Sequence, residues 1–225
     1  MKDPMPGPDP DGAAPHAARD DVGGDGDRAS DRDAVRRLIA SALPENSMGR
    51  PVEQRPDAQA ALWPLVDTVL SDPARVAALD RTGLLADPSR LELDRFAALA
   101  AEALGTRYAA VSLVDVDEQV LVGCNDQGEG SGRRRPLDQS ICKYAVASGE
   151  PLIVDDTSEH PLLPDSPVVQ DGSVGSYAGI PVTDQRGHTV GTLCAWDSTP
   201  RHWTGSQIQI LEDLTAVVRA KIFAG

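Results

Sequence analysis

The sequence predicts an α+β domain in which helices cover the faces of a central antiparallel sheet. Three observations carry this prediction. From about residue 81 the expected elements run in the order helix, hairpin, helix, strand, loop, hairpin and helix. The two hairpins turn at Asp115–Asp117 and Asp184–Gly187 and join consecutive strands, which favours antiparallel pairing. The helices carry apolar stripes that need a sheet face for burial.

The N-terminal segment differs in character from the rest of the chain. The 225 residues carry a net charge of −14. Residues 1–33 alone hold nine Asp, four basic residues, five Pro and five Gly, with no Leu, Ile or aromatic residue. Such a segment buries too little apolar surface to offset its ordering entropy. We expect a disordered acidic tail, with an interaction arm as the alternative.

Residues 34–80 are expected to form a helical lead-in and linker. A helical apolar pattern ends at Pro44, and a polar stretch follows it. Residues 57–80 predict two short helices, the first broken or kinked at Pro64 and the second capped by Asp72. Because these helices are too short to form a core of their own, we expect them to pack on the main domain or on a second chain.

The expected main domain spans residues 81–225 and begins with a helix. Ser89 and Glu92 match a capping box ahead of an apolar stripe over Leu93–Leu104. Gly105 follows the stripe and is typical of a left-handed C-terminal cap. We therefore expect a helix that is capped by Ser89 and ends before Gly105.

The first hairpin is followed by a loop. Residues 108–114 are apolar at successive positions, as in a strand covered on both faces, and residues 119–123 form its expected partner. Residues 125–135 are polar and rich in Gly, so a loop is expected there. This loop includes the basic cluster Arg133–Arg135. No aromatic residues interleave with the cluster, so we expect a solvated loop and not a phosphate or nucleic-acid site.

In the second half of the domain we expect a helix that is capped by Asp138 and ends at Gly149. Strands are expected at 151–154, 177–183 and 188–196. A capping box over Thr204–Gln207 should begin the final helix. Between these elements, residues 155–172 show no periodicity. A long segment without periodicity is often functional, so we expect it to border a site.

Composition excludes several classes of protein. With 21 Lys and Arg against 35 Asp and Glu, the chain lacks the basic footprint that nucleic acid or an anionic membrane surface requires. Its apolar runs are too short for a membrane span, and its polar start is no secretory signal. Cys124, Cys142 and Cys194 are odd in number and far apart, which fits reduced thiols. We expect a cytoplasmic protein without nucleic-acid or membrane partners.

Four parts of the main domain carry a family resemblance: Thr82–Leu85; Ser140–Val146 with Ser148–Val154; Tyr177–Val182; and Val190–Asp197 with Pro200 and Arg201. Their order and spacing make a signal that no single stretch provides. On these residues the chain, from about Thr82 to Ile222, resembles the GAF domain, a small-molecule sensor fold related to PAS.

The resemblance implies a sheet of about six strands, helices on one side that form a dimer surface, and a pocket on the other side beneath residues 155–175. It names no cofactor, because GAF domains bind cyclic nucleotides, haem, bilins, amino acids or small anions, or only dimerise. Many such domains carry Asp-Pro-Arg-Phe where this chain has Glu159–Leu163, and Arg-Phe where it has Gly175 and Ser176. Both changes remove a cation and an aromatic ring, which weakens the case for an anionic or stacking ligand.

Eight side chains are the expected ligand contacts: Ser140, Cys142, Tyr144, Asp156, His160, Tyr177, Cys194 and Trp196. Cys142 and Cys194 are expected mainly to pack: no neighbouring His or Asn in the sequence would activate Cys142 as a nucleophile, and Cys194 alternates with Leu193 and Ala195 on a strand. For His160 a solvent-facing position in the loop is the alternative to a ligand contact. No metal-ligand spacing such as Cys-x-x-Cys occurs, so neither a catalytic residue nor a metal site is expected.

The expected function is that of a regulatory domain and not of an enzyme. It would bind a small molecule and signal through a homodimer contact of Thr82–Leu104 and Thr204–Ile222, or through a partner protein. No catalytic output pattern accompanies it, so the chain is expected to act through that partner or as a fragment of a larger protein. Two alternatives are open. One is a ligand-free dimerisation or scaffold module. The other is a reductase of free methionine sulfoxide, which requires Cys142 and Cys194 to lie within about 7 Å between Cα atoms.

Overall fold

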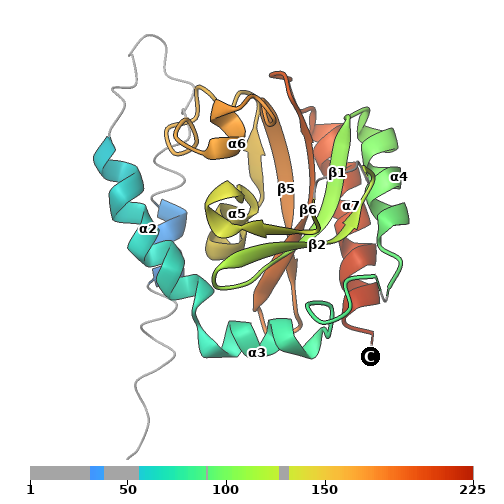
Figure 1. The fold of residues 1–225 in the computed structure, drawn as a ribbon. Coiled ribbons are helices and arrows are strands. Elements are labelled where there is room, and N and C mark those ends of the chain that lie inside the picture. Colours follow the sequence, from blue (N-terminus) through green and yellow to red (C-terminus); the bar gives the residue numbers. More distant parts are fainter. Residues whose placement is uncertain (1–30, 38–55, 90, 127–131, 225) are drawn as a thin grey trace, which may run out of the picture.

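Residues 31–37, 56–89, 91–126 and 132–224 are described by the structure, a computed structural model. At its centre is a six-stranded sheet in the order β3-β2-β1-β6-β5-β4, with every neighbouring pair antiparallel. Helices cover both faces of this sheet (Figure 1). The predicted α+β fold with about six antiparallel strands is confirmed.

Long strands form the middle of the sheet and short ones its edges: β1 (Tyr108–Val114), β2 (Glu118–Cys124), β3 (Arg134–Pro136), β4 (Leu152–Val154), β5 (Ser176–Thr183) and β6 (Thr189–Asp197). The central strands β1 and β6 pair with Ala110 opposite Cys194. Both are buried along nearly their whole length. Apolar side chains at successive positions fit this place, since a strand covered on both sides has no solvent-facing side. β3 was not expected, because it lies in the segment predicted as a loop.

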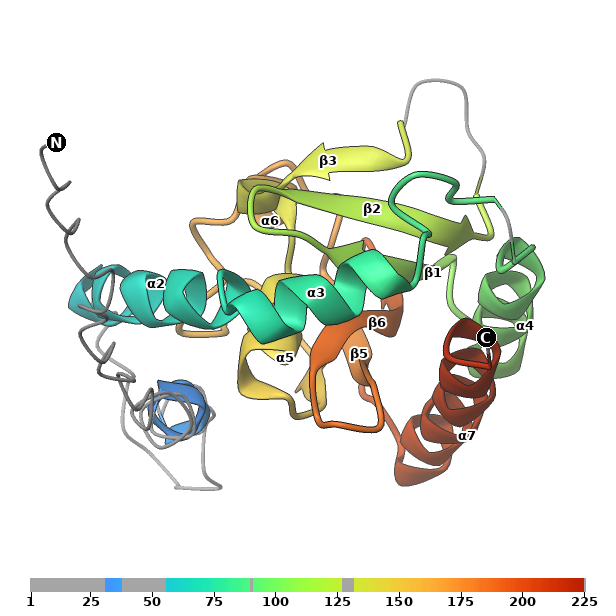
Figure 2. The same cartoon turned by 90° about the horizontal axis from the view of Figure 1, so that it is seen from below.

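Most helices cover a face of the sheet, and α3 (Pro73–Arg81) crosses one end of it (Figures 1 and 2). The other helices are α2 (Pro56–Leu70), α4 (Asp94–Leu104), η1 (Leu137–Gln139), α5 (Cys142–Ser148), α6 (Pro167–Gln170) and α7 (Gly205–Ile222). α4 and α7 lie side by side on one face, while α5 and α6 lie on the other with α2 outside α5 (Figures 1 and 2). Each face has its own apolar cluster. Within the described ranges, no helix is both long enough and apolar enough to cross a membrane.

One of the two predicted capping boxes forms and the other does not. The hydroxyl of Thr204 accepts from the backbone N–H of Gln207, and the Gln207 side chain accepts from the N–H of Thr204. The box predicted at Ser89 and Glu92 is wrong, since α4 begins only at Asp94 after a residue with no side-chain cap. Glu92 takes a left-handed conformation with φ of 51°, which is incompatible with a helical first turn.

The helix predicted from Asp138 is also interrupted. Asp138 lies in the short 3₁₀ turn η1, and the backbone of Ser140 is extended, with φ of −93° and ψ of 115°. α5 therefore begins only at Cys142, without a side-chain cap. Inside the irregular segment 155–172, Pro167 starts the single turn α6, as the preset φ of proline favours at a first helical position.

The described part of the lead-in packs on the main domain. Residues 31–37 are helical, so the last three residues of the predicted tail belong to a helix. Val35 is fully buried in the same apolar cluster as α2 and α5, and Arg36 Nε donates to the carbonyl of Ser148 at 2.8 Å. α2 continues through Pro64 instead of ending there. The rest of the predicted tail and linker lies in residues 1–30 and 38–55, outside the described residues.

Arg75 ties the lead-in helices to the sheet. Its side chain is fully buried; Nε donates to the carbonyl of Leu70 at the end of α2 at 2.8 Å, and Nη1 donates to that of Val114 at the end of β1 at 2.7 Å. Burial lowers the pKa of Arg75 to about 10, against the opposing charges of Asp115 and Asp72. The guanidinium is therefore still charged at neutral pH and supplies strong donors to two carbonyl groups that end an element.

Replacing Arg75 tests this connection. Arg75→Met keeps much of the side-chain length but leaves two buried carbonyl oxygens without their donors, so we expect unfolding free energy to fall by about 3 kcal/mol in urea denaturation. Arg95→Met on the exposed side of α4 is the matched control and should change stability by less than about 0.5 kcal/mol. Equal stability of the two variants would contradict this role for Arg75.

Candidate functional site

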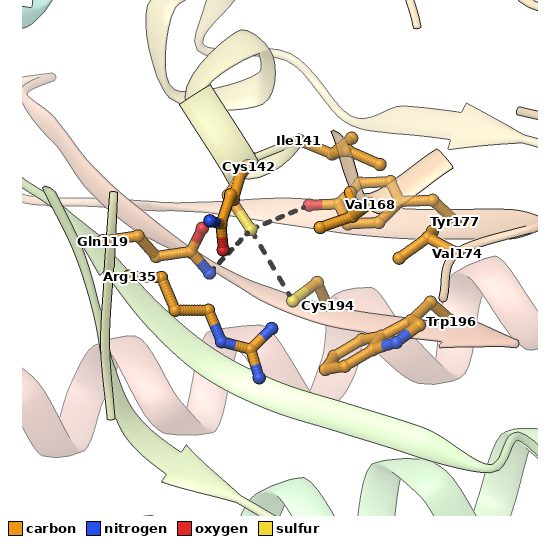
Figure 3. A pocket seen from close by; sticks show the side chains of 10 residues that line it. Gln119, Arg135, Ile141, Cys142, Val168, Val174, Tyr177, Cys194 and Trp196 are labelled. Atoms are coloured by element: carbon orange, nitrogen blue, oxygen red, sulfur yellow. Dashed lines mark hydrogen bonds between the residues drawn. The ribbon is translucent and has the colours of Figure 1, made fainter. Parts of the chain in front are cut away.

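A small pocket lies between the sheet and the helices α5 and α6. Its volume is about 40 Å³, against the roughly 10–15 Å³ that a cavity needs to hold one water molecule, so it has room for a few waters. Ten side chains line it: Gln119, Arg135, Gln139, Ile141, Cys142, Val168, Val174, Tyr177, Cys194 and Trp196. They come from four strands and from the segments that cover this face of the sheet (Figure 3).

Two cysteine thiols meet at the pocket. Cys142 is the first residue of α5, and its Sγ lies 3.8 Å from the Sγ of Cys194 in β6. The Cys194 thiol also lies 3.5 Å from the carbonyl oxygen of Ala110 in the neighbouring strand. Both cysteines are free and buried. They are 52 residues apart in the sequence and meet because α5 packs against β6.

Tyr177 and Gln119 direct two further donors at the Cys142 sulfur. The hydroxyl of Tyr177 in β5 donates at 3.2 Å, and Nε2 of Gln119 in β2 donates at the longer distance of 3.7 Å (Figure 3). Donors around a sulfur stabilise its thiolate form more than its thiol form. The arrangement therefore prepares Cys142, and not Cys194, to carry a negative charge.

The position of the Tyr177 ring depends on a glycine two residues later. A Cβ on Gly179 would lie 2.7 Å from Cζ of Tyr177 and would also overlap its hydroxyl group. Successive side chains of a strand alternate between faces, so residues 177 and 179 share one face. Gly179 thus leaves room for the ring to lie along β5 and to reach Cys142.

The two thiols have opposite pKa shifts. A hydrogen bond from Cys194 lowers the pKa of Cys142 to about 6, with the hydroxyls of Thr192, Tyr177 and Ser112 adding to this effect and burial opposing it. That same hydrogen bond, together with burial, raises the pKa of Cys194 well above its usual value. Burial and the nearby thiols also raise the pKa of Tyr177. These shifts favour a thiolate at Cys142 and keep the protons on Cys194 and Tyr177.

Two hydroxyls near this thiolate have no other partner. Ser112 and Thr192 lie opposite each other in β1 and β6, and both are fully buried. Among the described residues, neither hydroxyl makes a hydrogen bond in the observed geometry. Buried polar groups are normally satisfied, so these hydroxyls are available to turn toward a charged Cys142 sulfur.

The structure brings four of the eight predicted contact residues to the pocket, namely Cys142, Tyr177, Cys194 and Trp196. The other four are not among its lining residues. Ser140 is buried between two lining residues, and Tyr144 packs in the apolar cluster, where Nζ of Lys143 lies 5.2 Å from its ring centroid. Ligand binding by any of the eight stays a prediction.

Asp156 and His160 hold the turns of the segment beyond β4. Asp156 Oδ1 accepts from the N–H of Ser158 at 2.9 Å. His160 is buried, and its Nδ1 accepts from the N–H of Leu162 at 3.3 Å, which places the ring proton on Nε2. The predicted solvent-facing alternative for His160 is therefore wrong. The apolar surroundings supplied by this segment bury the ring, as the residue types alone did not indicate.

Sequence reasoning missed six lining residues, of which Arg135 matters most. The cluster Arg133–Arg135 is not a solvated loop: Arg133 pairs with Asp94 at 2.9 Å, Arg134 pairs with Glu118, and Arg135 lines the pocket from β3. Arg134 and Arg135 are successive residues of β3, so their side chains point to opposite sides of the strand, and Arg133 precedes the strand. In the sequence, the only sign of a role for Arg135 was its place in a run of three adjacent arginines.

Arg135 and Trp196 also correct the expectation drawn from the altered pocket loop. That loop lacks the cation and the ring found in many relatives, yet the sheet supplies both to the pocket. The Trp196 ring stacks on Tyr108 with centroids 5.4 Å apart, which fixes its orientation. Within the residues that the structure describes, no three His, Cys, Asp or Glu side chains converge as a metal site would require.

Comparisons with known proteins agree with this architecture. A model of the GAF domain matches residues 90–222. A curated cyclic di-GMP phosphodiesterase of Pseudomonas aeruginosa is 28% identical over 154 residues, which cover 66% of this chain and 25% of the relative. The match therefore spans about a quarter of the length of that protein.

Solved structures with this fold include GAF domains and an enzyme. The GAF domain of an Acinetobacter phosphoenolpyruvate-protein phosphotransferase superposes with a TM-score of 0.49 and 17% identity, over 67% of this chain and 94% of that one. The free methionine-R-sulfoxide reductase of Neisseria meningitidis superposes with a TM-score of 0.48 and 21% identity, over 80% of this chain and 97% of that one. The GAF-B domain of DevS from Mycobacterium smegmatis superposes with a TM-score of 0.46 and 17% identity, over 60% of this chain and 93% of that one.

These comparisons overturn the expectation that the chain is not an enzyme. The finding that contradicts it is the curated relative, which is named as a cyclic di-GMP phosphodiesterase. The expectation rested on the absence of a catalytic output pattern and of an activating residue near Cys142 in the sequence. Tyr177 and Gln119 supply donors to this thiol from distant strands instead.

Buried His160 predicts a pH dependence of stability. Burial lowers its pKa to about 4, below the unfolded value of about 6.5, so the unfolded chain binds the extra proton more readily. The stabilising contribution is complete above pH 6.5 and is lost as the pH falls to 4, on the order of 3 kcal/mol. His160→Asn keeps an acceptor for Leu162 without titrating in this range. In urea denaturation between pH 7 and 4, the unfolding free energy of the variant should fall less than that of the wild-type chain. Parallel falls in the two proteins would refute this role for His160.

Proposed function

Because the chain belongs to the GAF domain family, we propose that it is a regulatory sensor domain that binds a small molecule in the pocket beneath α5 and α6. The observation that carries this proposal is the meeting of Arg135 and Trp196 at one pocket. The Arg135 side chain is half-buried and makes no hydrogen bond or ion pair with another described residue. A guanidinium with free donors beside an aromatic ring favours a small carboxylate or phosphate ligand.

The size of the pocket links binding to a movement. At about 40 Å³ it has room for only a few water molecules, so a larger ligand must displace part of its lining. The segment with α6 is the candidate, because it contributes Val168 and Val174 and contains only one helical turn. A ligand that binds only the displaced form shifts the population toward it, as sensing requires. Polar lining groups and thiols count against a ligand-free scaffold.

We assign the output to the opposite face of the sheet. α4 and α7 lie side by side there, and their outer surfaces expose Leu99, Ile210 and Val217 to between 36% and 50%. Exposed apolar side chains on two adjacent helices fit the expected homodimer contact through Thr82–Leu104 and Thr204–Ile222, or a contact with a signalling partner.

Ligand binding is tested with the whole chain and a panel of small carboxylates and phosphates. We expect a subset to raise the melting temperature of the chain and to be retained in native mass spectra, because a ligand of the folded state stabilises it by mass action. Arg135→Gln should abolish the shift, whereas Arg186→Gln, on the exposed β5–β6 turn, should preserve it. An unchanged response of Arg135→Gln would show that anions bind elsewhere.

A second candidate function is thiol-dependent reduction of a sulfoxide, favoured by the 3.8 Å between the Cys142 and Cys194 sulfurs. The Cys142 thiolate would attack the sulfoxide sulfur; with one proton taken up, the S–O bond of the substrate breaks, the oxygen passes to Cys142 as a sulfenic acid and the sulfide leaves. Cys194 then displaces water to form a disulfide, which an external dithiol reduces. Such a substrate also needs the pocket to open.

This activity has a direct assay. The chain, supplied with free methionine sulfoxide, thioredoxin, its reductase and NADPH, should consume NADPH repeatedly, and both Cys142→Ser and Cys194→Ser should stop turnover. Cys124→Ser is the matched control and should retain it, since Cys124 does not line the pocket. NADPH consumption that survives in Cys142→Ser would exclude this mechanism.

A further inference from the structure

The contact between Cys142 and Cys194 allows a reaction that requires neither a bound ligand nor catalytic turnover. We propose that these two cysteines form a modification site for hydroperoxides: a hydroperoxide oxidises Cys142, and Cys194 closes an intramolecular disulfide at the pocket. The inference goes beyond the sensor proposal, because the chain itself is the substrate and the disulfide is the stored product.

The reaction balances with one hydroperoxide and two thiols. The Cys142 thiolate attacks the distal oxygen of the O–O bond, which breaks, giving Cys142 sulfenic acid and an alcohol, or water from hydrogen peroxide. The sulfur of Cys194 then attacks the sulfenic sulfur, the S–O bond breaks, and water leaves with the proton from Cys194. Two thiols and one hydroperoxide thus give one disulfide, one alcohol and one water. An external dithiol restores both thiols by exchange.

The first step has its activating groups in place. The Tyr177 hydroxyl lies 3.2 Å from the Cys142 sulfur, within reach to stabilise the thiolate and to give a proton toward the departing oxygen. The raised pKa of Tyr177 keeps that proton on the hydroxyl, while the lowered pKa of Cys142 favours its thiolate. A thiolate is the reactive form of cysteine.

The pocket limits which oxidant reaches the thiolate. Its volume of about 40 Å³ admits a molecule of the size of hydrogen peroxide, which contains only two heavy atoms. A sulfoxide of an amino acid is several times larger and requires displacement of the lining. A pocket of this size therefore favours a small hydroperoxide over the sulfoxide of the second candidate function.

The second step needs a small movement, and the structure indicates which side moves. A disulfide has an S–S length of about 2.05 Å, against the present 3.8 Å. Cys194 lies in a strand that pairs on both sides, with β1 and with β5, and is therefore held in place. Cys142 is the first residue of a seven-residue helix whose N-terminus has no side-chain cap. Closure is thus expected to draw the first turn of α5 toward the sheet.

A shift of α5 would reach the lead-in through Lys143. This buried side chain follows Cys142 directly; its Nζ donates to the carbonyl of Leu137 at 3.2 Å and lies 4.5 Å from the ring centroid of Trp63 on α2. Cation–π contacts depend on the position of the cation over the ring. Oxidation of Cys142 should therefore change the surroundings of Trp63.

The test treats the full chain, without added ligand, with an equimolar amount of hydrogen peroxide. We expect the number of free thiols to fall from three to one, and peptide mapping to find a Cys142–Cys194 disulfide in the monomer. Cys124→Ser should form the same disulfide. Cys194→Ser should instead accumulate a sulfenic acid at Cys142 that a dimedone-type probe captures.

Tryptophan fluorescence of the wild-type chain should change on oxidation and return with a dithiol, and Trp63→Phe should reduce that change.

The pH profile gives an independent readout. The rate of disulfide formation should rise with a midpoint near pH 6, because the reactive thiolate is lost below the pKa of Cys142. Tyr177→Phe and Gly179→Ala, which remove or displace the hydroxyl, should slow the reaction and move the midpoint to higher pH. A disulfide that involves Cys124, a purely intermolecular product, or a rate no faster than that of free cysteine would overturn the proposal. Loss of anion binding in Arg135→Gln bears only on the sensor function.

Discussion

Burial of both faces of the sheet is the constraint on which the rest of the structure depends. β1 and β6 lie at the centre of the sheet and are closed to solvent on either side, so each face needs its own layer of helices. Close packing of these layers requires glycine at a contact such as Gly123, where a Cβ would lie 2.6 Å from the backbone of Leu93. Arg75 is needed for the same reason, because its guanidinium donates hydrogen bonds to two carbonyl groups that this packing removes from water.

The two faces are used differently. The face beneath α4 and α7 is an apolar core, and its cover presents exposed apolar residues outward. The face beneath α5 holds buried polar groups among the apolar ones: the two thiols, the hydroxyls of Ser112 and Thr192, and the phenol of Tyr177. Burying polar groups costs free energy unless they interact, so their concentration beside one pocket sets this face apart from the other.

Much of the fold follows from patterns within short segments. Alternating and continuous apolar runs predicted the strands, and the capping box at Thr204 and the glycine at 105 predicted helix ends that the structure has. Predictions failed where neighbours in space overrule a local pattern. The carboxylate of Asp94 accepts from the Cys124 N–H and pairs with Arg133, and α4 starts there instead of near Ser89.

The sequence by itself determined the order of elements, the antiparallel hairpins and the stretches that resemble a GAF domain, because these depend on periodicity and turn chemistry within a few residues of each other. Four pocket residues were found through that resemblance. Only the tertiary structure decided that Cys142 and Cys194 touch, that Tyr177 faces their sulfurs and that Arg135 completes the pocket. Reactivity of a thiol is set by donors and charges within a few ångströms, and those come from strands and helices distant in the chain.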